Sequence, residues 1–434
     1  MIRPSTVLRT NRNFRLLFFG QAISQLGDWF NSVAVFALLL DLTGSATAVA
    51  WMMIVQFLPM AVVGPFAGVV VDRVDRRRVM IAADLIRGVL VLGLLLIRRP
   101  DQVWIAYVIM TLTVSASAFF EPARTATIPN VTTAEELMPA NALSSATWSA
   151  MLALGASVGG LITAISGREW AFVINAGSFF VSAFFIGRTH IPHTAAPREG
   201  RSLRSLSGID EMIEGFRYIR RHSHVAALIF VKAGWGIAGG VLLLLTIFGQ
   251  RVFPVGGTTA AGIGILYGAR GIGAALGPMA LRWVLGQEPA TLRRSIGPAY
   301  FIVGIFYVGL AFSPVLPLAA FSVLMAHFGG SILWVFSTVL LQMEVPNRFR
   351  GRVFSAELAL VTLTSSISSY VTAYALDSVG WSPRTMAFVL GSLFCVPGIL
   401  WLMMLSRWRD TGEPMQAPEA SPSAEEEELE GRIG

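Results

Sequence analysis

Residues 46–97 read ATAVAWMMIVQFLPMAVVGPFAGVVVDRVDRRRVMIAADLIRGVLVLGLLLI, two long apolar runs joined by a short basic turn. Each run is long enough to cross the hydrocarbon core of a bilayer as a helix, which needs about 20 residues. The turn carries Arg73 and Arg76 to Arg78, and basic loops of this kind stay on the cytoplasmic side of a membrane. The pattern predicts two antiparallel membrane-spanning helices.

The same pattern continues along the whole chain. Of its 434 residues, 54% are hydrophobic and only 14% are charged, whereas about 25% charged is usual in soluble domains. The apolar segments do not alternate with a period of two, as the strands of a membrane barrel would. We therefore predict an all-α membrane protein with twelve spanning helices. The predicted spans are 14–40, 46–71, 79–97, 102–120, 139–166, 169–187, 225–249, 259–286, 295–313, 315–341, 353–376 and 383–405.

Basic residues are distributed unevenly between the two sides that these helices define. With the N-terminus in the cytoplasm, 24 of the 33 Lys and Arg residues fall on that side and five fall outside. The positive-inside rule then predicts that both termini are cytoplasmic. Because the bases lie between apolar segments, the net charge of +7 indicates membrane topology and no nucleic-acid partner. We expect an integral protein of the bacterial inner (plasma) membrane.

The longest polar break divides the helices into two groups of six. Gly64-Pro65 and Gly277-Pro278 stand at equivalent places in the two groups, as a parallel duplication of a six-helix unit requires. Residues 209–222 have apolar residues at helical spacing and predict an amphipathic helix, either on the cytoplasmic membrane surface or as a plain linker. The predicted units are the N-terminal bundle 1–187, the linker 188–224, the C-terminal bundle 225–405 and an acidic disordered tail 406–434.

Ionisable side chains inside spanning helices are costly to bury, so each is a candidate functional group. Asp28 lies near the middle of the first predicted helix, with no basic residue within one helical turn in sequence. A carboxyl group at that depth can bind and release a proton. Asn31 shares its helix face and can bind either a substrate or this carboxyl. The alternative is that Asp28 is paired to another helix and serves packing only.

Four further residues are candidates for the same cavity. Lys232 and Arg270 can each supply the partner of Asp28 or bind an anionic group of a substrate, and the sequence does not choose between them. Glu357 is a second candidate proton site. His327 titrates in the useful range, although a hydrogen-bonded packing role fits it equally well.

Other features indicate structure or exclude chemistry. Asp84 and Arg87 stand three residues apart in one helix, and we expect them to neutralise each other as a structural ion pair. The sequence contains no zinc-type cluster, no P-loop, no GxSxG and no dinucleotide fingerprint in the required setting. We therefore expect no enzyme activity, no metal and no cofactor.

The turn and several other strings resemble the major facilitator superfamily, and within it the drug:proton antiporter branch that includes macrolide and siderophore exporters. GVVVDRVDRRR at 68–78 is similar to the loop of that family, with Asp75 where the family usually has Gly. GASVGG at 155–160 is similar to the antiporter pattern of the fifth helix, with Ala156 in place of proline. The other similar strings are GQAISQLGD (20–28), FFEPARTATIP (119–129), INAGSFFVSA (174–183), ARGIGAALGP (269–278) and VPNRFRGRVF (345–354).

This resemblance implies roles for particular residues. Asp28 matches the acid of the first helix in that branch and is implied to couple protons or to bind substrate. The family's central cavity is formed by helices 1, 4, 7 and 10. The lining residues that this implies are Asp28, Glu121, Arg124, Lys232 and His327, with the cytoplasmic gate as the alternative place for Glu121 and Arg124. Residues of the implied cytoplasmic gate are Gly68, Asp72, Arg73 and Arg76, joined by Glu121 and Arg124 at the predicted cytoplasmic end of the fourth helix.

Together these observations predict a secondary active transporter that works by alternating access. We expect it to export an amphipathic small molecule or drug in exchange for protons, as a monomer surrounded by membrane lipids. The alternatives are a lipid or lysophospholipid flippase and a dedicated metabolite or siderophore exporter. A membrane-embedded enzyme and a passive channel are more distant alternatives.

Overall fold

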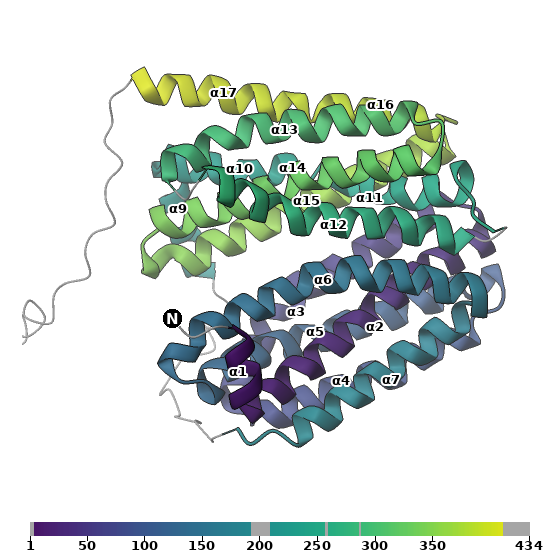
Figure 1. Ribbon diagram of the computed structural model, residues 1–434, viewed down its shortest axis with the longest axis vertical. Coiled ribbons are helices and arrows are strands. Elements are labelled where there is room, and N and C mark those ends of the chain that lie inside the picture. The colour runs from purple at the N-terminus through teal and green to yellow at the C-terminus, as the bar shows by residue number, and fades with distance from the viewer. Residues whose placement is uncertain (1–3, 192–208, 257–258, 286–287, 411–434) are drawn as a thin grey trace, which may run out of the picture.

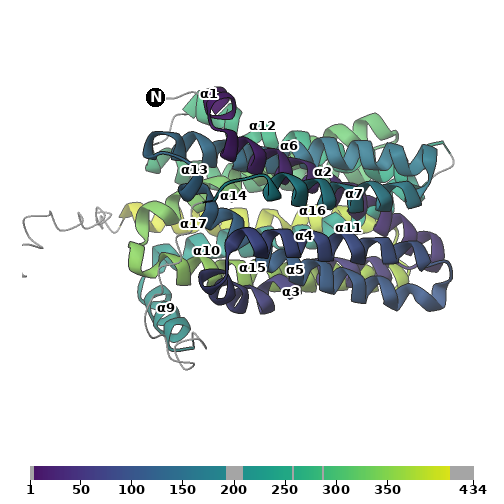
Figure 2. The ribbon, with the colours of Figure 1, turned by 90° about the horizontal axis from the view of Figure 1, so that it is seen from below.

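The computed structural model describes residues 4–191, 209–256, 259–285 and 288–410. Eleven helices in these ranges are long and apolar enough to cross a membrane, and α6 adds a shorter apolar stretch, Ala150–Ser166. The prediction of an all-α chain of twelve spanning helices is confirmed. Figure 1 shows the helices running side by side in two groups, and in the view from below in Figure 2 the two groups overlap, with the helices again running along one common direction.

The first half of the chain begins with a short helix, α1, that the sequence analysis did not predict. Its six spanning helices have the expected order but extend beyond several of the predicted limits. The helices are α1 (Pro4–Thr10), α2 (Arg12–Thr43), α3 (Ala46–Arg73), α4 (Arg76–Leu92), α5 (Val103–Val131), α6 (Ala134–Ser166) and α7 (Arg168–Gly187), with short turns at Gly93–Leu96 and Pro100–Gln102.

The second half contains six spans, two of which are made of two helices each. The linker helix α9 (Ile209–Arg221) precedes them, and residues 192–208 and the tail 411–434 lie outside the described ranges. The spans consist of α10 (Ser223–Trp235) with α11 (Ala238–Ile247), α12 (Thr259–Leu285), α13 (Pro289–Phe312), α14 (Leu316–Glu344), α15 (Asn347–Asp377), and α16 (Pro383–Leu393) with α17 (Cys395–Asp410).

Two predicted limits were wrong for a shared reason. The fourth span was expected to end at residue 120 and the fifth to begin at 139, but α5 continues to Val131 and α6 begins at Ala134. Proline at 122, 129 and 139 suggested helix ends. In a membrane bundle, neighbouring helices and side chains satisfy the backbone groups that proline leaves free, so a helix can continue through it. Glu121 and Arg124 therefore lie inside α5 and not at its end.

The seventh span, predicted as one helix over 225–249, is broken between α10 and α11. Gly236 caps α10 at the break, and a Cβ atom there would lie 2.6 Å from the Cβ of Thr364 in α15. A side chain at this position would collide with α15, so glycine permits the close approach. The break lies one turn beyond Lys232.

The linker helix α9 packs against the C-terminal half. Arg352 in α15 donates a hydrogen bond to Glu214 over 2.6 Å, and the rings of Tyr218 and Phe349 stack with centroids 4.4 Å apart. Phe216 remains 66% exposed. These contacts attach α9 to α15, so it is more than a free surface helix.

The two halves are held together at the end of the bundle opposite the chain termini, which we call the far end. Asp377, the last residue of α15, accepts hydrogen bonds from the backbone N–H of Ala46 (3.1 Å) and Thr47 (2.8 Å) and from the hydroxyls of Ser45 and Thr47 (both 2.8 Å). It therefore caps the start of α3 from the other half of the protein. Arg251 also donates to the carbonyl of Gly44 over 2.5 Å.

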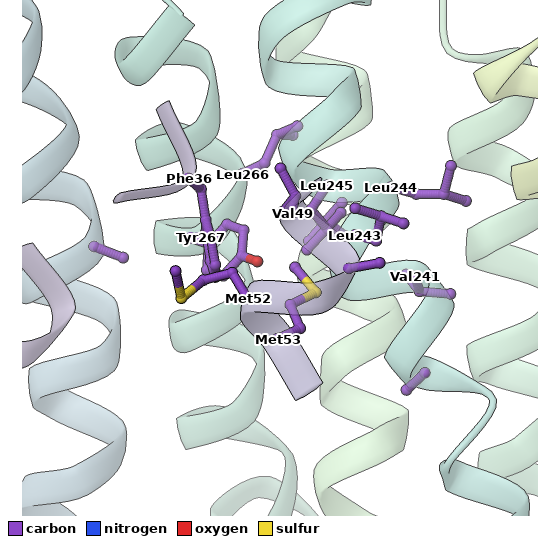
Figure 3. Packing of buried hydrophobic residues seen from close by; sticks show 14 of the residues in the cluster. Phe36, Val49, Met52, Met53, Val241, Leu243, Leu244, Leu245, Leu266 and Tyr267 are labelled. Carbon is purple, nitrogen blue, oxygen red and sulfur yellow. The ribbon is translucent and has the colours of Figure 1, made fainter. Parts of the chain in front are cut away.

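A layer of apolar side chains from both halves lies next to this polar contact. Phe36 of α2 faces Tyr267 of α12, with ring centroids 6.2 Å apart. Figure 3 shows these rings beside Met52 and Met53 of α3 and near Leu243 to Leu245 of α11. All of them belong to one buried cluster that continues through both halves. The junction between the halves is therefore closed by dry packing as well as by hydrogen bonds.

The helices α6 and α12 bring the backbones of the two halves into close contact. A Cβ atom built on Gly160 would lie 2.6 Å from the Cα of Gly264, and one built on Gly264 would lie 2.8 Å from the Cα of Gly160. At this point no side chain lies between the backbones of the two helices. Glycine at both positions lets them meet face to face, as small residues do in membrane bundles.

Replacing Asp377 with alanine is expected to open the far end, because it removes four hydrogen bonds that cross between the halves. Spin labels at Pro100 and Val379, introduced after Cys395 is replaced, would measure the separation. We expect a population with a longer distance to grow at least tenfold, because one hydrogen bond to a charged group contributes about 1.5–3 kcal/mol and about 1.4 kcal/mol corresponds to a factor of ten. Asp101→Ala, which breaks a pair with Arg99 inside one half, is the control. An unchanged distance distribution in D377A would contradict the latch.

Candidate functional site

Eight ionisable Asp, Glu, Lys and Arg residues lie deep in the described spans, at least seven residues from either end. Four are acidic and four are basic. Three pairs form among them, and one carboxylate and one guanidinium remain. The eight residues are Asp28, Asp84, Arg87, Glu121, Arg124, Lys232, Arg270 and Glu357.

Asp84 and Arg87 form an ion pair within α4, and both side chains are buried. The Arg87 guanidinium also lies over the rings of Phe120 (4.5 Å) and Phe179 (4.3 Å) and donates to the hydroxyl of Ser117 over 3.3 Å. Contacts with a carboxylate, a hydroxyl and two rings fix the guanidinium on nearly every side. The pair thus joins α4 to α5 and α7.

Glu121 and Arg124 pair within α5, where Arg124 Nη2 lies 2.8 Å from Glu121 Oε2. Arg124 Nη1 also donates to Gln21 Oε1 in α2 over 2.8 Å. Since α5 extends to Val131, this pair lies about two turns inside the helix. The sequence analysis assigned both residues to a gate at the helix end, and the structure places them between α5 and α2.

Lys232 and Glu357 pair in the C-terminal half, between α10 and α15. Lys232 Nζ lies 2.8 Å from Glu357 Oε2, and the two side chains are only 5% and 4% exposed. Lys232 Nζ also lies 4.6 Å from the centre of the Trp334 ring. Glu357 Oε1 is buried and has no hydrogen-bond partner among the described residues. Lys232 is therefore committed to Glu357 and does not serve as the partner of Asp28.

Asp28 is half-buried in α2, and its carboxylate has no hydrogen bond or ion pair within the described ranges; the Ser32 hydroxyl donates to its backbone carbonyl over 2.9 Å. The charges that act on it are Arg87, with opposite sign, and Asp84 and Glu121, with the same sign. Arg87 is already bonded to Asp84. Among the deeply placed charges of this half, three carboxylates and the two arginines Arg87 and Arg124 thus leave one negative charge in excess, and Asp28 carries it.

Asn31, one turn from Asp28, points elsewhere. It is 2% exposed, and its Nδ2 lies 3.4 Å from the sulfur of Met110. Its Oδ1 is buried without a hydrogen-bond partner among the described residues. The expected bond between Asn31 and the Asp28 carboxyl is not formed here, because Asn31 is turned into the packing between α2 and α5.

His327 is 3% exposed and makes a 2.8 Å hydrogen bond between its Nε2 and the hydroxyl of Tyr307. The edge of its ring meets Trp235, with centroids 5.7 Å apart. Of the two roles considered for His327, these contacts favour packing within the C-terminal half.

Arg270 differs from the other three interior cations. It is half-buried in α12, and its guanidinium carbon lies 5.7 Å from the centre of the Trp29 ring and 5.5 Å from that of Tyr267. No carboxylate pairs with it in the part of the chain that the structure describes. Trp29 belongs to α2 of the other half and is the neighbour of Asp28 in sequence. Arg270 therefore stands at the junction of the halves with aromatic partners only.

The side chains of Asp72 and Arg73 and the burial of Gly68 lie outside what the structure describes, although the backbone of all three residues belongs to α3. Arg76 Nη1 donates to the carbonyl of Ala126 in α5 over 2.9 Å. Asp75, where the family usually has Gly, accepts a hydrogen bond from the N–H of Arg77 over 2.9 Å and caps the start of α4. The cap explains an acid at this position, which the sequence analysis noted only as a departure from the family.

Twelve spanning helices in two halves that meet at one end, with isolated charges between them, define a membrane transporter. The chain belongs to the Major Facilitator Superfamily, whose family model matches residues 17–356. The family resemblance drawn from the sequence strings is thus confirmed. Among the described residues no group of three His, Cys, Asp or Glu side chains gathers as a metal site would.

The chain is similar to exporters of this superfamily. BacE, the provisionally assigned bacilysin exporter of Bacillus subtilis (strain 168), is 27% identical over 365 residues, which cover 82% of this chain and 87% of BacE. Macrolide efflux protein A of Streptococcus pyogenes is 26% identical over 386 residues, 85% of this chain and 91% of that protein. A crystal structure of the peptide transporter POT has the same fold, with a TM-score of 0.71 at 12% identity over 94% of this chain and 99% of that one. The chain is a secondary transporter of the small-molecule export type.

Proposed function

We propose that this transporter exports an amphipathic small molecule in exchange for protons, and that Asp28 is the residue that carries the proton. The observation that supports this is the carboxylate of Asp28, which has no ion-pair partner among the described residues and gives the deep interior of the N-terminal half one negative charge in excess. A proton on Asp28 neutralises that excess. Binding or losing it changes the charge in the interior of the N-terminal half, and a change of charge can favour one of the two arrangements of an alternating-access cycle over the other.

The contacts between the halves suggest how the charge is coupled to movement. In this structure the halves are joined at the far end by Asp377, Arg251 and the apolar layer. The positive-inside pattern assigns the far end to the outside of the cell. The described conformation then corresponds to a transporter closed toward the outside, and export requires these contacts to break while the opposite end closes.

The three interior ion pairs have a supporting part in this proposal. Each of the three pairs lies within one half and stabilises that half as a unit: Asp84 with Arg87, Glu121 with Arg124, and Lys232 with Glu357. Arg76 fixes the start of α4 to α5 beside the turn that carries Asp72 and Arg73. We assign this turn to the gate at the cytoplasmic end, as the family resemblance implies.

Asp28→Asn is expected to abolish proton movement driven by substrate while leaving the protein folded, because asparagine keeps the shape but cannot lose a proton. Purified protein would be reconstituted into liposomes that enclose a pH-sensitive dye. A panel of amphipathic dyes and antibiotics would then be added, and wild-type protein should produce a pH change with some of them. D28N should reduce that change at least tenfold.

Asp41→Asn is the matched control, because Asp41 is an acid of the same helix whose partner Arg168 lies at the far end. D41N should keep the pH response. Normal substrate-driven proton flux in D28N would refute the role of Asp28. Movement of head-group-labelled lipid without any pH response in wild-type protein would favour the flippase alternative.

A further inference from the structure

The balance of interior charges leaves one cation without an acidic partner. Arg87, Arg124 and Lys232 each bond to a carboxylate within the same half of the protein. Arg270, equally deep in its span, has none among the residues that the structure describes. A guanidinium held in the interior of a membrane protein is costly unless it meets an anion or water.

The surroundings of Arg270 place it where a substrate would bind. Its guanidinium lies between Tyr267 of its own helix and Trp29 of the other half. The ring of Tyr267 faces Phe36, which belongs to the apolar layer that closes the far end. Arg270 therefore lies next to that layer, at the junction between the halves. It is half-buried, so part of its side chain remains accessible.

We propose that Arg270 binds an acidic group of the exported molecule, with Trp29 and Tyr267 packing against the apolar part next to that group. This inference rests on the proposed export function and specifies its substrate class as amphipathic molecules that carry a carboxylate or a similar anion. Arginine suits this task because its planar fork can donate two parallel hydrogen bonds to one carboxylate. The two rings belong to different halves, so a molecule bound here contacts both of them.

The competing explanation is that the two rings alone hold Arg270 in place for packing. Cation–π contacts at more than 5 Å are weak beside the desolvation of a guanidinium, and they leave its N–H groups without acceptors. The other interior arginine with ring contacts, Arg87, has two rings at shorter distances and still bonds to a carboxylate. Arg87, whose role is structural, is therefore paired with a carboxylate, whereas Arg270 has no carboxylate partner among the described residues.

A matched pair of probes separates these explanations. Rhodamine B carries a free carboxylate, and its ethyl ester has the same rings without that charge. Binding of each dye to purified wild-type protein would be measured by fluorescence anisotropy, alongside Arg270→Gln, Arg270→Lys and the control Arg98→Gln. Arg98 is exposed at the far end and pairs with Glu169, so R98Q should behave as wild type.

Wild-type protein is expected to bind the acid more tightly than the ester. R270Q should weaken binding of the acid by about tenfold or more and leave the ester unchanged, since only the acid loses a charged hydrogen bond. R270K should recover part of the loss for the acid alone. Equal weakening of both dyes by R270Q, no effect on either, or no binding of either dye by wild type would overturn the proposal.

The proton-flux experiment on Asp28 tests the proposed export function separately from the substrate class that the dye pair tests. It depends on a different residue and on a wide panel of compounds. A negative result with the dye pair beside an intact, Asp28-dependent pH response would reject the acidic substrate class and leave proton-coupled export standing.

Discussion

Lys232→Met is expected to destabilise the folded protein more than any other single change considered for this chain. Removing the cation leaves Glu357 buried, and one of its oxygens already has no hydrogen-bond partner among the residues whose placement is described. Breaking a buried ion pair from one side costs about 3–5 kcal/mol in measured cases. The loss of the contact between Lys232 and the Trp334 ring adds to this.

The measurement is the midpoint of thermal unfolding of the detergent-solubilised protein. K232M should lower it by several degrees, and the double change Lys232→Met with Glu357→Leu should recover most of the loss, because replacing both charges with apolar side chains removes the unpaired charge. The exposed pair of Arg99 and Asp101 offers a matched comparison, since surface pairs contribute about 0–1 kcal/mol. If K232M and the double variant unfold at the same temperature, the pair does not behave as a buried ion pair.

Gly264→Ala is expected to reduce transport by an order of magnitude or more, even though alanine adds a single methyl group. Its Cβ would lie 2.8 Å from the Cα of Gly160 and 3.0 Å from the carbonyl oxygen of Ala156. Both atoms belong to the backbone of α6, so neither can move aside without displacing the helix. Alanine at position 264 therefore pushes the two halves apart. The contacts at the far end depend on the present spacing of the halves and are weakened as a result.

Gly177→Ala is the control, because no heavy atom lies within 4 Å of a Cβ built there. Alanine in place of an unconstrained helical glycine generally stabilises by about 0.5–1 kcal/mol. Transport of any panel compound into liposomes would be compared for the two variants at equal amounts of folded protein. Wild-type rates in G264A would show that the α6–α12 contact is not maintained through the cycle.

The sequence by itself was sufficient for the class of fold and for most helix positions. Membrane helices are selected by length and hydropathy, which are local properties, and the basic turn after residue 71 could be recognised without any contact. Helix ends at proline and the break at Gly236 were the exceptions. Both depend on what a neighbouring helix offers to the backbone, and a sequence pattern does not contain that information.

For the candidate site, the sequence identified the interior charges but not their partners. The pair within α4 followed from spacing alone, because residues three apart on a helix are neighbours. The partner of Lys232 lies 125 residues away, and Asp377 reaches the start of α3 across 330 residues or more. The packing of the two halves determines which charges meet. Only the tertiary structure therefore decided that, within the described ranges, Asp28 and Arg270 are the interior charges without an ion-pair partner, because pairing over such separations depends on how whole helices lie against one another.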